Sequence, residues 1–182
     1  MLSDQSHPAR LSVSADWLAT ATSRPENMRR HLLDHPKAPV VLDAGIAFDV
    51  LDLPAELGTA LLGRLLAEQL PAIDSGTGRV LLLVAPQGRG GELATVLASL
   101  EPELRERLDV RYLGCGGHLV MPALDGSRGP ARWLRLPGPQ WKLPTLAELW
   151  PEVVRASGLG WPVPSAAADP AAHRPLAASL AD

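Results

Sequence analysis

The feature that constrains this chain most is an unbroken apolar run, Val-Leu-Leu-Leu-Val-Ala, which follows Arg79 and ends at residue 85. A strand with one face in water alternates apolar and polar side chains, and this run has no such alternation. Strands that are buried on both faces show this continuous pattern. We therefore predict a central strand at 79–85 that is covered on both sides by other parts of the chain.

Weaker patterns predict the elements around that strand. Apolar stretches bounded by Gly, Pro or Asp predict strands at 38–45, 46–53, 108–114, 117–123 and 131–136. Apolar spacings of three and four residues predict helices at 14–21, 24–35, 54–70, 92–100 and 145–157. Helices alternate with strands early and strands cluster late, so we expect an α/β or α+β fold with a mixed β-sheet packed by helices. One sheet should contain 46–53, 79–85, 108–114 and 117–123, with helix 54–70 on its face.

Length and composition fit one domain. The chain has 182 residues, of which 46% are hydrophobic, enough for a sizeable core. We expect a flexible, polar N-terminus at 1–12, a single domain at 13–157, and a disordered Pro/Ala-rich tail at 158–182. The net charge of −3 argues against a protein that coats nucleic acid non-specifically. The single cysteine excludes an internal disulfide and no apolar stretch has membrane-spanning length, so we expect a cytoplasmic protein without a membrane partner.

Two aspartates in the strand 46–53 raise the question of a metal site. Carboxylates two residues apart share a face of a strand and can converge on one Mg²⁺, but Asp49 and Asp52 are three apart. A regular strand points them to opposite faces, and only a bulge would bring them together. The position that should carry the partner of Asp52 is Pro54, which has no ligating atom. In the structural alternative, Asp52 stabilises the start of the following helix.

Four blocks of the sequence resemble the N-terminal domain of bifunctional DNA primase/polymerases, in the archaeo-eukaryotic primase superfamily. They are FDVLDLPAELG, TGRVLLLVAP, LDVRYLGCGGHLVMPA and GPARW, in this order over residues 15–155. The chain resembles in particular short actinobacterial chains that carry a degenerate version of that domain. The resemblance implies a primase/polymerase-like fold and a family chemistry of templated nucleotidyl transfer, in which carboxylates hold divalent metals.

Carried over position by position, the resemblance implies a vestigial catalytic site. Asp52 takes the first acidic position and Asp109 a later one, whereas the second acidic position falls on Pro54. The histidine that contacts the nucleotide in the family falls on or near Val80, where this chain has none. We expect Asp52 and Asp109 to approach each other across neighbouring strand ends and to hold Mg²⁺ or Mn²⁺ weakly or not at all.

Two further segments carry candidate binding residues. A glycine-rich loop at 85–93 lies between a strand and a helix, a setting in which backbone N–H groups bind phosphate, so Arg79 and Arg89 are candidate nucleotide contacts. The loop matches neither G-x-G-x-x-G nor the P-loop pattern, and the structural alternative is a plain flexible connection. The stretch 126–142 has cations and tryptophans but no acid, a composition that suits single-stranded nucleic acid. Its candidates are Arg128, Arg132, Trp133, Arg135 and Lys142. The structural alternative places Trp133 in the core and the arginines at a solvated strand edge.

Three functional hypotheses follow from these features. The leading one is a DNA primase/polymerase-like domain that has lost catalysis and keeps binding to a nucleotide, to DNA or to a replication protein. The second is an active metal-dependent DNA primase/polymerase that uses Asp49, Asp52 and Asp109 with Mg²⁺ or Mn²⁺. The third is a non-catalytic structural or protein-interaction module.

Overall fold

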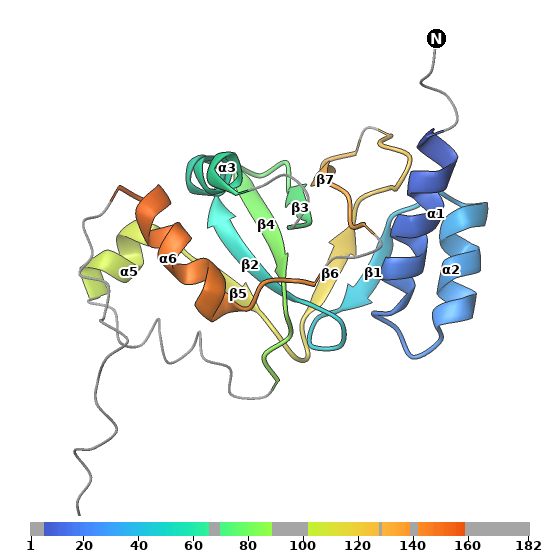
Figure 1. Ribbon diagram of the computed structural model, residues 1–182, viewed down its shortest axis with the longest axis horizontal. Coiled ribbons are helices and arrows are strands. Elements are labelled where there is room, and N and C mark those ends of the chain that lie inside the picture. The colour runs from blue at the N-terminus through green and yellow to red at the C-terminus, as the bar shows by residue number, and fades with distance from the viewer. Residues whose placement is uncertain (1–5, 66–69, 89–101, 128, 139–141, 159–182) are drawn as a thin grey trace, which may run out of the picture.

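The computed structural model describes residues 6–65, 70–88, 102–127, 129–138 and 142–158. Within these residues two sheets and two groups of helices form the molecule (Figure 1). The strands are β1 (Val40–Asp43), β2 (Asp49–Pro54), β3 (Ala72–Asp74), β4 (Arg79–Val84), β5 (Arg111–Leu113), β6 (His118–Met121) and β7 (Arg132–Arg135). The helices are α1 (Ser6–Ala19), α2 (Pro25–Asp34), α3 (Ala55–Arg64), α5 (Pro102–Leu108) and α6 (Leu146–Ala156).

The central strand predicted at 79–85 is confirmed. The five-stranded sheet has the order β5-β2-β4-β3-β7, so β4 has a neighbour on each side. Every strand pairing in the described part of the chain is antiparallel, and helices pack beside the sheets, which makes the fold α+β as expected. The β2–β4 register runs without a break from the pair Asp49 and Val84 to the pair Pro54 and Arg79.

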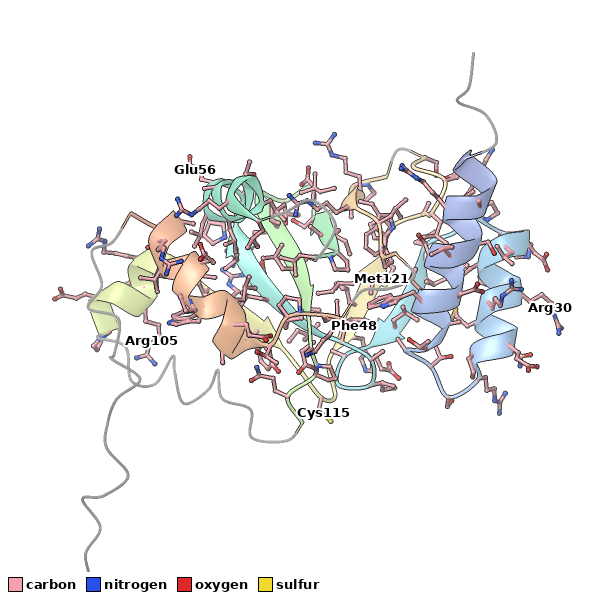
Figure 2. The ribbon with its side chains drawn as sticks, in the orientation of Figure 1. Arg30, Phe48, Glu56, Arg105, Cys115 and Met121 are labelled. Atoms are coloured by element: carbon pink, nitrogen blue, oxygen red, sulfur yellow. The ribbon has the colours of Figure 1, made fainter. Side chains whose placement is uncertain are left out.

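Both faces of the five-stranded sheet are covered, which explains the continuous apolar pattern of β4. Leu82 on one face packs with residues of α3 and α6, and Leu83 on the other face packs with residues of α1, α2, β1 and β6. Figure 1 shows α1 and α2 beyond β1 and β6, with α3 and α6 at the other side of the molecule. The apolar side chains on the face toward α1 and α2 form what we call the second core. Phe48 and Met121 are fully buried in it, between the five-stranded sheet and the pair of helices α1 and α2 (Figure 2).

The prediction that 117–123 joins the same sheet is wrong. Strand β6 pairs with β1 in a separate two-stranded sheet, from Val40 opposite Met121 to Asp43 opposite His118. A tight turn after β5 redirects the chain, with the Gly117 N–H donating to the carbonyl oxygen of Gly114 at 2.9 Å. Turn geometry of this kind decides which partner a short strand finds, and apolar alternation alone does not encode it.

Several element boundaries also differ from the prediction. Helix α1 begins at Ser6, inside the segment 1–12 that was expected to be flexible, and strand β3 and helix α5 were not predicted. Three residues are enough for β3 because it lies between β4 and β7, whose pairing supplies its burial. The helix predicted at 92–100 and the tail after 158 lie outside the described residues.

The start of α6 follows from its sequence. The Thr145 hydroxyl accepts a hydrogen bond from the Glu148 N–H, and the Glu148 carboxylate accepts one from the Thr145 N–H at 2.7 Å. This reciprocal capping box satisfies backbone donors that a helix start leaves without partners. The bonds also lower the pKa of Glu148, because they favour its charged form.

Helix α3 packs against β4 through a glycine, which generates a stability prediction. A Cβ atom at Gly58 would lie 2.4 Å from the Cβ atom of Val80, and both residues are buried. Gly58→Ala should therefore force α3 away from β4 and lower the free energy of unfolding by about 1–3 kcal/mol. Gly63→Ala in the same helix meets no atom within 4 Å and should raise it by about 0.5–1 kcal/mol. Denaturant unfolding measures both, and equal changes would contradict the close packing.

Candidate functional site

Strand pairing places three charged side chains on one face of the five-stranded sheet. Asp52 of β2 lies directly opposite Arg111 of β5, and Pro54 lies opposite Arg79 of β4. Residues opposite each other in antiparallel strands point to the same face, and so do residues two apart along one strand. Asp52, Arg79 and Arg111 therefore share a face at one end of the sheet. Asp109 stands two residues before Arg111, in the turn that leads from α5 into β5.

The guanidinium group of Arg79 binds both aspartates. Its Nε donates to Oδ1 of Asp52 at 2.5 Å, and its Nη1 donates to Oδ2 of Asp109 at 2.5 Å. Its Nη2 donates to two backbone carbonyl oxygens, that of Asp52 at 3.1 Å and that of Asp109 at 2.7 Å. The structure thus brings Asp52 and Asp109 together across neighbouring strand ends, with a protein cation between them.

The backbone at Asp109 adapts to this contact. Asp109 has a φ angle of 42°, in the left-handed region, where it ends helix α5 in the place that glycine most often takes. Aspartate tolerates this conformation better than most side chains do. A glycine would fit the same turn but would lack the carboxylate that Arg79 and Arg111 bind.

Charge is balanced within this Arg79 cluster, which we define as Asp52, Arg79, Asp109 and Arg111. Hydrogen bonding to Arg79 lowers the pKa of Asp109, and the charge of Arg111, 3.2 Å away, adds to the effect. Burial alone would lower the pKa of Arg79, but the bonds to Asp52 and Asp109 outweigh it and raise that pKa. Two carboxylates and two guanidinium groups leave the cluster with no net charge.

Two expectations about this end of the sheet are corrected. Asp52 does not cap α3: the N-cap is Pro54, no side chain caps it within the described residues, and the Ala55 N–H donates to the Gly78 carbonyl oxygen at 2.9 Å. Position 80, where the family histidine was placed, does not face Asp52. Val80 is 2% exposed and packs with α3, whereas Arg79 occupies the face that carries Asp52.

Asp49 lies in a different environment from Asp52. It is fully buried, and one of its carboxylate oxygens accepts hydrogen bonds from the Tyr112 hydroxyl and from the Gln87 N–H, the latter at 2.7 Å. Burial and the neighbouring Asp49 raise the pKa of Tyr112, so its hydroxyl remains a donor. The unbroken β2–β4 register lacks the bulge that would bring Asp49 beside Asp52. Asp49 is therefore part of a buried hydrogen-bond network on the opposite face.

The residues of the basic stretch 126–142 do not form one cluster. Trp133 packs in the second core, and its indole N–H donates to the Pro122 carbonyl oxygen at 3.1 Å. Arg135 donates to the carbonyl oxygens of Leu62 and Leu65, at 2.5 and 3.3 Å, and so caps the last turn of α3. Burial lowers the pKa of Arg135. A register shift where β7 pairs with β3 lets these two side chains reach opposite faces.

The remaining candidates are dispersed. Arg132 is exposed and forms an ion pair with Asp74 at 3.1 Å, and Lys142 is exposed beyond the end of β7. Arg89 and Arg128 lie outside the described residues. Sequence reasoning missed Arg111, although its distance of two residues from Asp109 on a predicted strand was the signal that could have found it.

The donor set does not fit the divalent metals that the resemblance implies. Pro54 contributes no ligand, and the carboxylates of Asp52 and Asp109 already bind Arg79. Within the ranges that the structure describes, no group of three or more His, Cys, Asp or Glu side chains is arranged to hold a metal ion. The same ranges contain no helix long and apolar enough to cross a membrane.

The described residues thus form a helix-packed antiparallel sheet with two aspartates at adjoining strand ends. The chain matches the family model described as bifunctional DNA primase/polymerase, N-terminal, over residues 2–152. That match covers most of the chain, so the protein belongs to this primase/polymerase family. No curated protein and no solved structure gave a significant match.

The Arg79 cluster generates a prediction about stability and pH. Arg79→Met leaves two carboxylates without their shared partner, and near pH 7 it should lower the free energy of unfolding by about 1–3 kcal/mol. The folded-state pKa of Asp109 is lowered, so its contribution is present above its unfolded pKa of about 3.9 and is lost as pH falls through the lowered value. The difference between wild type and variant should therefore shrink below about pH 4.

Denaturant titrations at neutral and acidic pH measure this difference. The matched control is Arg132→Met, which breaks an exposed pair with Asp74 and should cost at most about 1 kcal/mol. A cost of Arg79→Met that stays the same at both pH values would contradict the assignment to ion pairing.

Asp49 generates a second prediction for this region. One oxygen of Asp49 and the side-chain oxygen of Gln87 are buried and have no hydrogen-bond donor among the described residues. Asp49→Asn keeps an acceptor for Tyr112 and adds a donor, so the free energy of unfolding should change by less than about 1 kcal/mol in thermal unfolding. Asp49→Ala removes the acceptor of two partly buried donors, the Tyr112 hydroxyl and the Gln87 N–H, and should lower the free energy of unfolding by about 2 kcal/mol. Equal losses in the two variants would show that the carboxylate charge is required.

Proposed function

We propose that this protein is a primase/polymerase-like domain that has lost metal-dependent nucleotidyl transfer and binds nucleic acid or nucleotide without a metal. The observation that carries the proposal is the guanidinium of Arg79 between Asp52 and Asp109. A divalent ion would have to displace this covalently attached cation, and with it four hydrogen bonds. The replacement of the second acidic position by Pro54 supports the same conclusion.

Electrostatics supports phosphate binding in the absence of metal. A bare pair of carboxylates repels phosphate, and primase/polymerase chemistry overcomes that repulsion with divalent ions. Here Arg79 neutralises the pair. The Arg111 side chain is 62% exposed and points to the same face as Asp52, so it retains donors for a phosphate oxygen. We assign Arg111 as the principal phosphate contact and Asp52 and Asp109 as vestigial catalytic positions.

The biological setting belongs to the same proposal. The family membership supports a role near DNA replication, with DNA, a nucleotide or a replication protein as the partner. The single cysteine suits a reducing compartment, which supports a cytoplasmic location in an actinobacterial cell.

The binding experiment uses the full chain and fluorescently labelled single-stranded DNA. Fluorescence anisotropy should report binding that is unchanged by a chelator, because no metal takes part. Arg111→Gln should weaken binding and reduce the slope of log affinity against log salt by about 1. The control is Arg155→Gln, which removes an exposed arginine of α6 that pairs with Glu152 and should leave the affinity unchanged. If the protein bound neither DNA nor nucleotides, the proposal would be wrong, and a structural or protein-interaction module would be the remaining interpretation.

A second assay tests the loss of catalysis. Incubation of the protein with a primed template, labelled nucleotides and Mg²⁺ or Mn²⁺ should give no incorporation. Template-dependent incorporation that Asp52→Ala abolishes would overturn the proposal and establish an active primase/polymerase. The control reaction is a metal-dependent polymerase on the same template, which excludes a defective substrate.

A further inference from the structure

The outer face of the two-stranded sheet carries side chains that the fold leaves in solvent. Strands β1 and β6 lie side by side, with Val41 opposite Val120 and Asp43 opposite His118 (Figure 1). Met121, on the other face of this sheet, is fully buried in the second core, whereas Val41 and Val120 are 59% and 58% exposed. We call Val41, Asp43, His118 and Val120 the outer patch.

Exposed apolar side chains are concentrated at this patch. In the part of the chain that the structure describes, four large hydrophobic side chains are exposed: Val41, Ile46, Val120 and Leu134. The two valines lie opposite each other on neighbouring strands, and Ile46 lies in the turn between β1 and β2. A single exposed apolar side chain is ordinary on a protein surface, but neighbouring ones mark an interaction site. The outer patch therefore has the character of an interaction surface.

The charged end of the patch can complement itself. Asp43 and His118 form an exposed pair, with Oδ1 of the aspartate 2.8 Å from Nδ1 of the histidine. The acidic side chain belongs to β1 and the basic one to β6. A two-fold axis parallel to the strands and midway between them places β1 of one copy over β6 of a second copy. That operation brings Asp43 of each copy to His118 of the other, and Val41 of each copy to Val120 of the other.

We propose that the outer patch is a contact between two copies of this chain, packed face to face about this two-fold axis. Facing sheets pack about 10 Å apart, with the side chains of both faces between them. The valines exclude water from the centre of the contact, and the Asp43 and His118 pairs fix its register. A two-fold axis across the strands would instead separate Asp43 from His118 of the other copy.

The size of the patch predicts a weak dimer. Two exposed valines in each copy bury much less than the roughly 800 Å² per partner of a standard stable interface. We therefore expect a dissociation constant of roughly 10 µM to 1 mM, with exchange between monomer and dimer. The outer patch shares no residue with the Arg79 cluster, so this inference does not depend on what that cluster binds.

Sedimentation velocity on the full chain tests the contact. A reducing agent keeps Cys115 from forming a disulfide, and the wild type should shift from monomer to dimer as its concentration rises. Val41→Lys should raise the dissociation constant by at least about tenfold, because a two-fold interface contains the change twice. The matched control is Leu134→Lys, which alters an exposed apolar side chain of β7 and should leave the constant unchanged. Both side chains are exposed, so both variants should keep the wild-type Tm.

A charge exchange tests the geometry of the contact. Asp43→Lys and His118→Asp each place like charges against one another in a homodimer, so each variant alone should remain monomeric. An equimolar mixture of the two variants should form heterodimers, because both contacts between the copies then join opposite charges. Sedimentation velocity of each variant and of the mixture, at one total concentration, measures this difference.

Three results would overturn the proposal. A wild type that stays monomeric up to about 1 mM would show that the outer patch does not bind a second copy. A dimer that Val41→Lys does not weaken would use another surface of the molecule. Two folded charge variants that fail to associate in the mixture would exclude the proposed two-fold axis. These experiments contain no nucleic acid, so each outcome leaves the proposal about the Arg79 cluster unaffected.

Discussion

The strand ends of the five-stranded sheet depend on one set of contacts, the hydrogen bonds of the Arg79 guanidinium group. Its hydrogen bonds join the end of β2, the start of β4 and the turn into β5, three segments far apart in the sequence. Arginine suits this role better than lysine, because its planar fork presents several donors in fixed directions. The side chain is only 13% exposed, so water competes weakly for these donors. These hydrogen bonds therefore hold the strand ends in place and also neutralise the charge of the two aspartates.

The same contact is the basis of the proposed loss of metal-dependent chemistry. A divalent ion is exchangeable, so its carboxylates must remain accessible and bind strongly only when the substrate arrives. A guanidinium is held by the chain itself and neutralises the aspartates without exchanging with solvent. The two aspartates therefore have a structural role that does not depend on catalysis, because both bind the guanidinium of Arg79.

The sequence allowed part of this to be predicted, for identifiable reasons. The uniform apolar pattern of β4 required burial on both faces, and the odd spacing of Asp49 and Asp52 required opposite faces, since both follow from local strand geometry. The pairing of β6 with β1 and the ion pairs of Arg79 depend on segments distant in sequence, which local periodicity does not register. Arg135 resembled a nucleic-acid contact by composition, but the shifted register of β7 directs it to α3.

That last contact has a consequence for how the fold opens. Helix α3 is held at its start by the Gly78 carbonyl and at its end by Arg135, and both belong to or adjoin strands of the five-stranded sheet. An edge strand normally frays independently of its neighbours, but β7 cannot detach without uncapping α3. Strand β7 and helix α3 therefore form a single cooperative unit of local unfolding, in which their backbone amides exchange with solvent together.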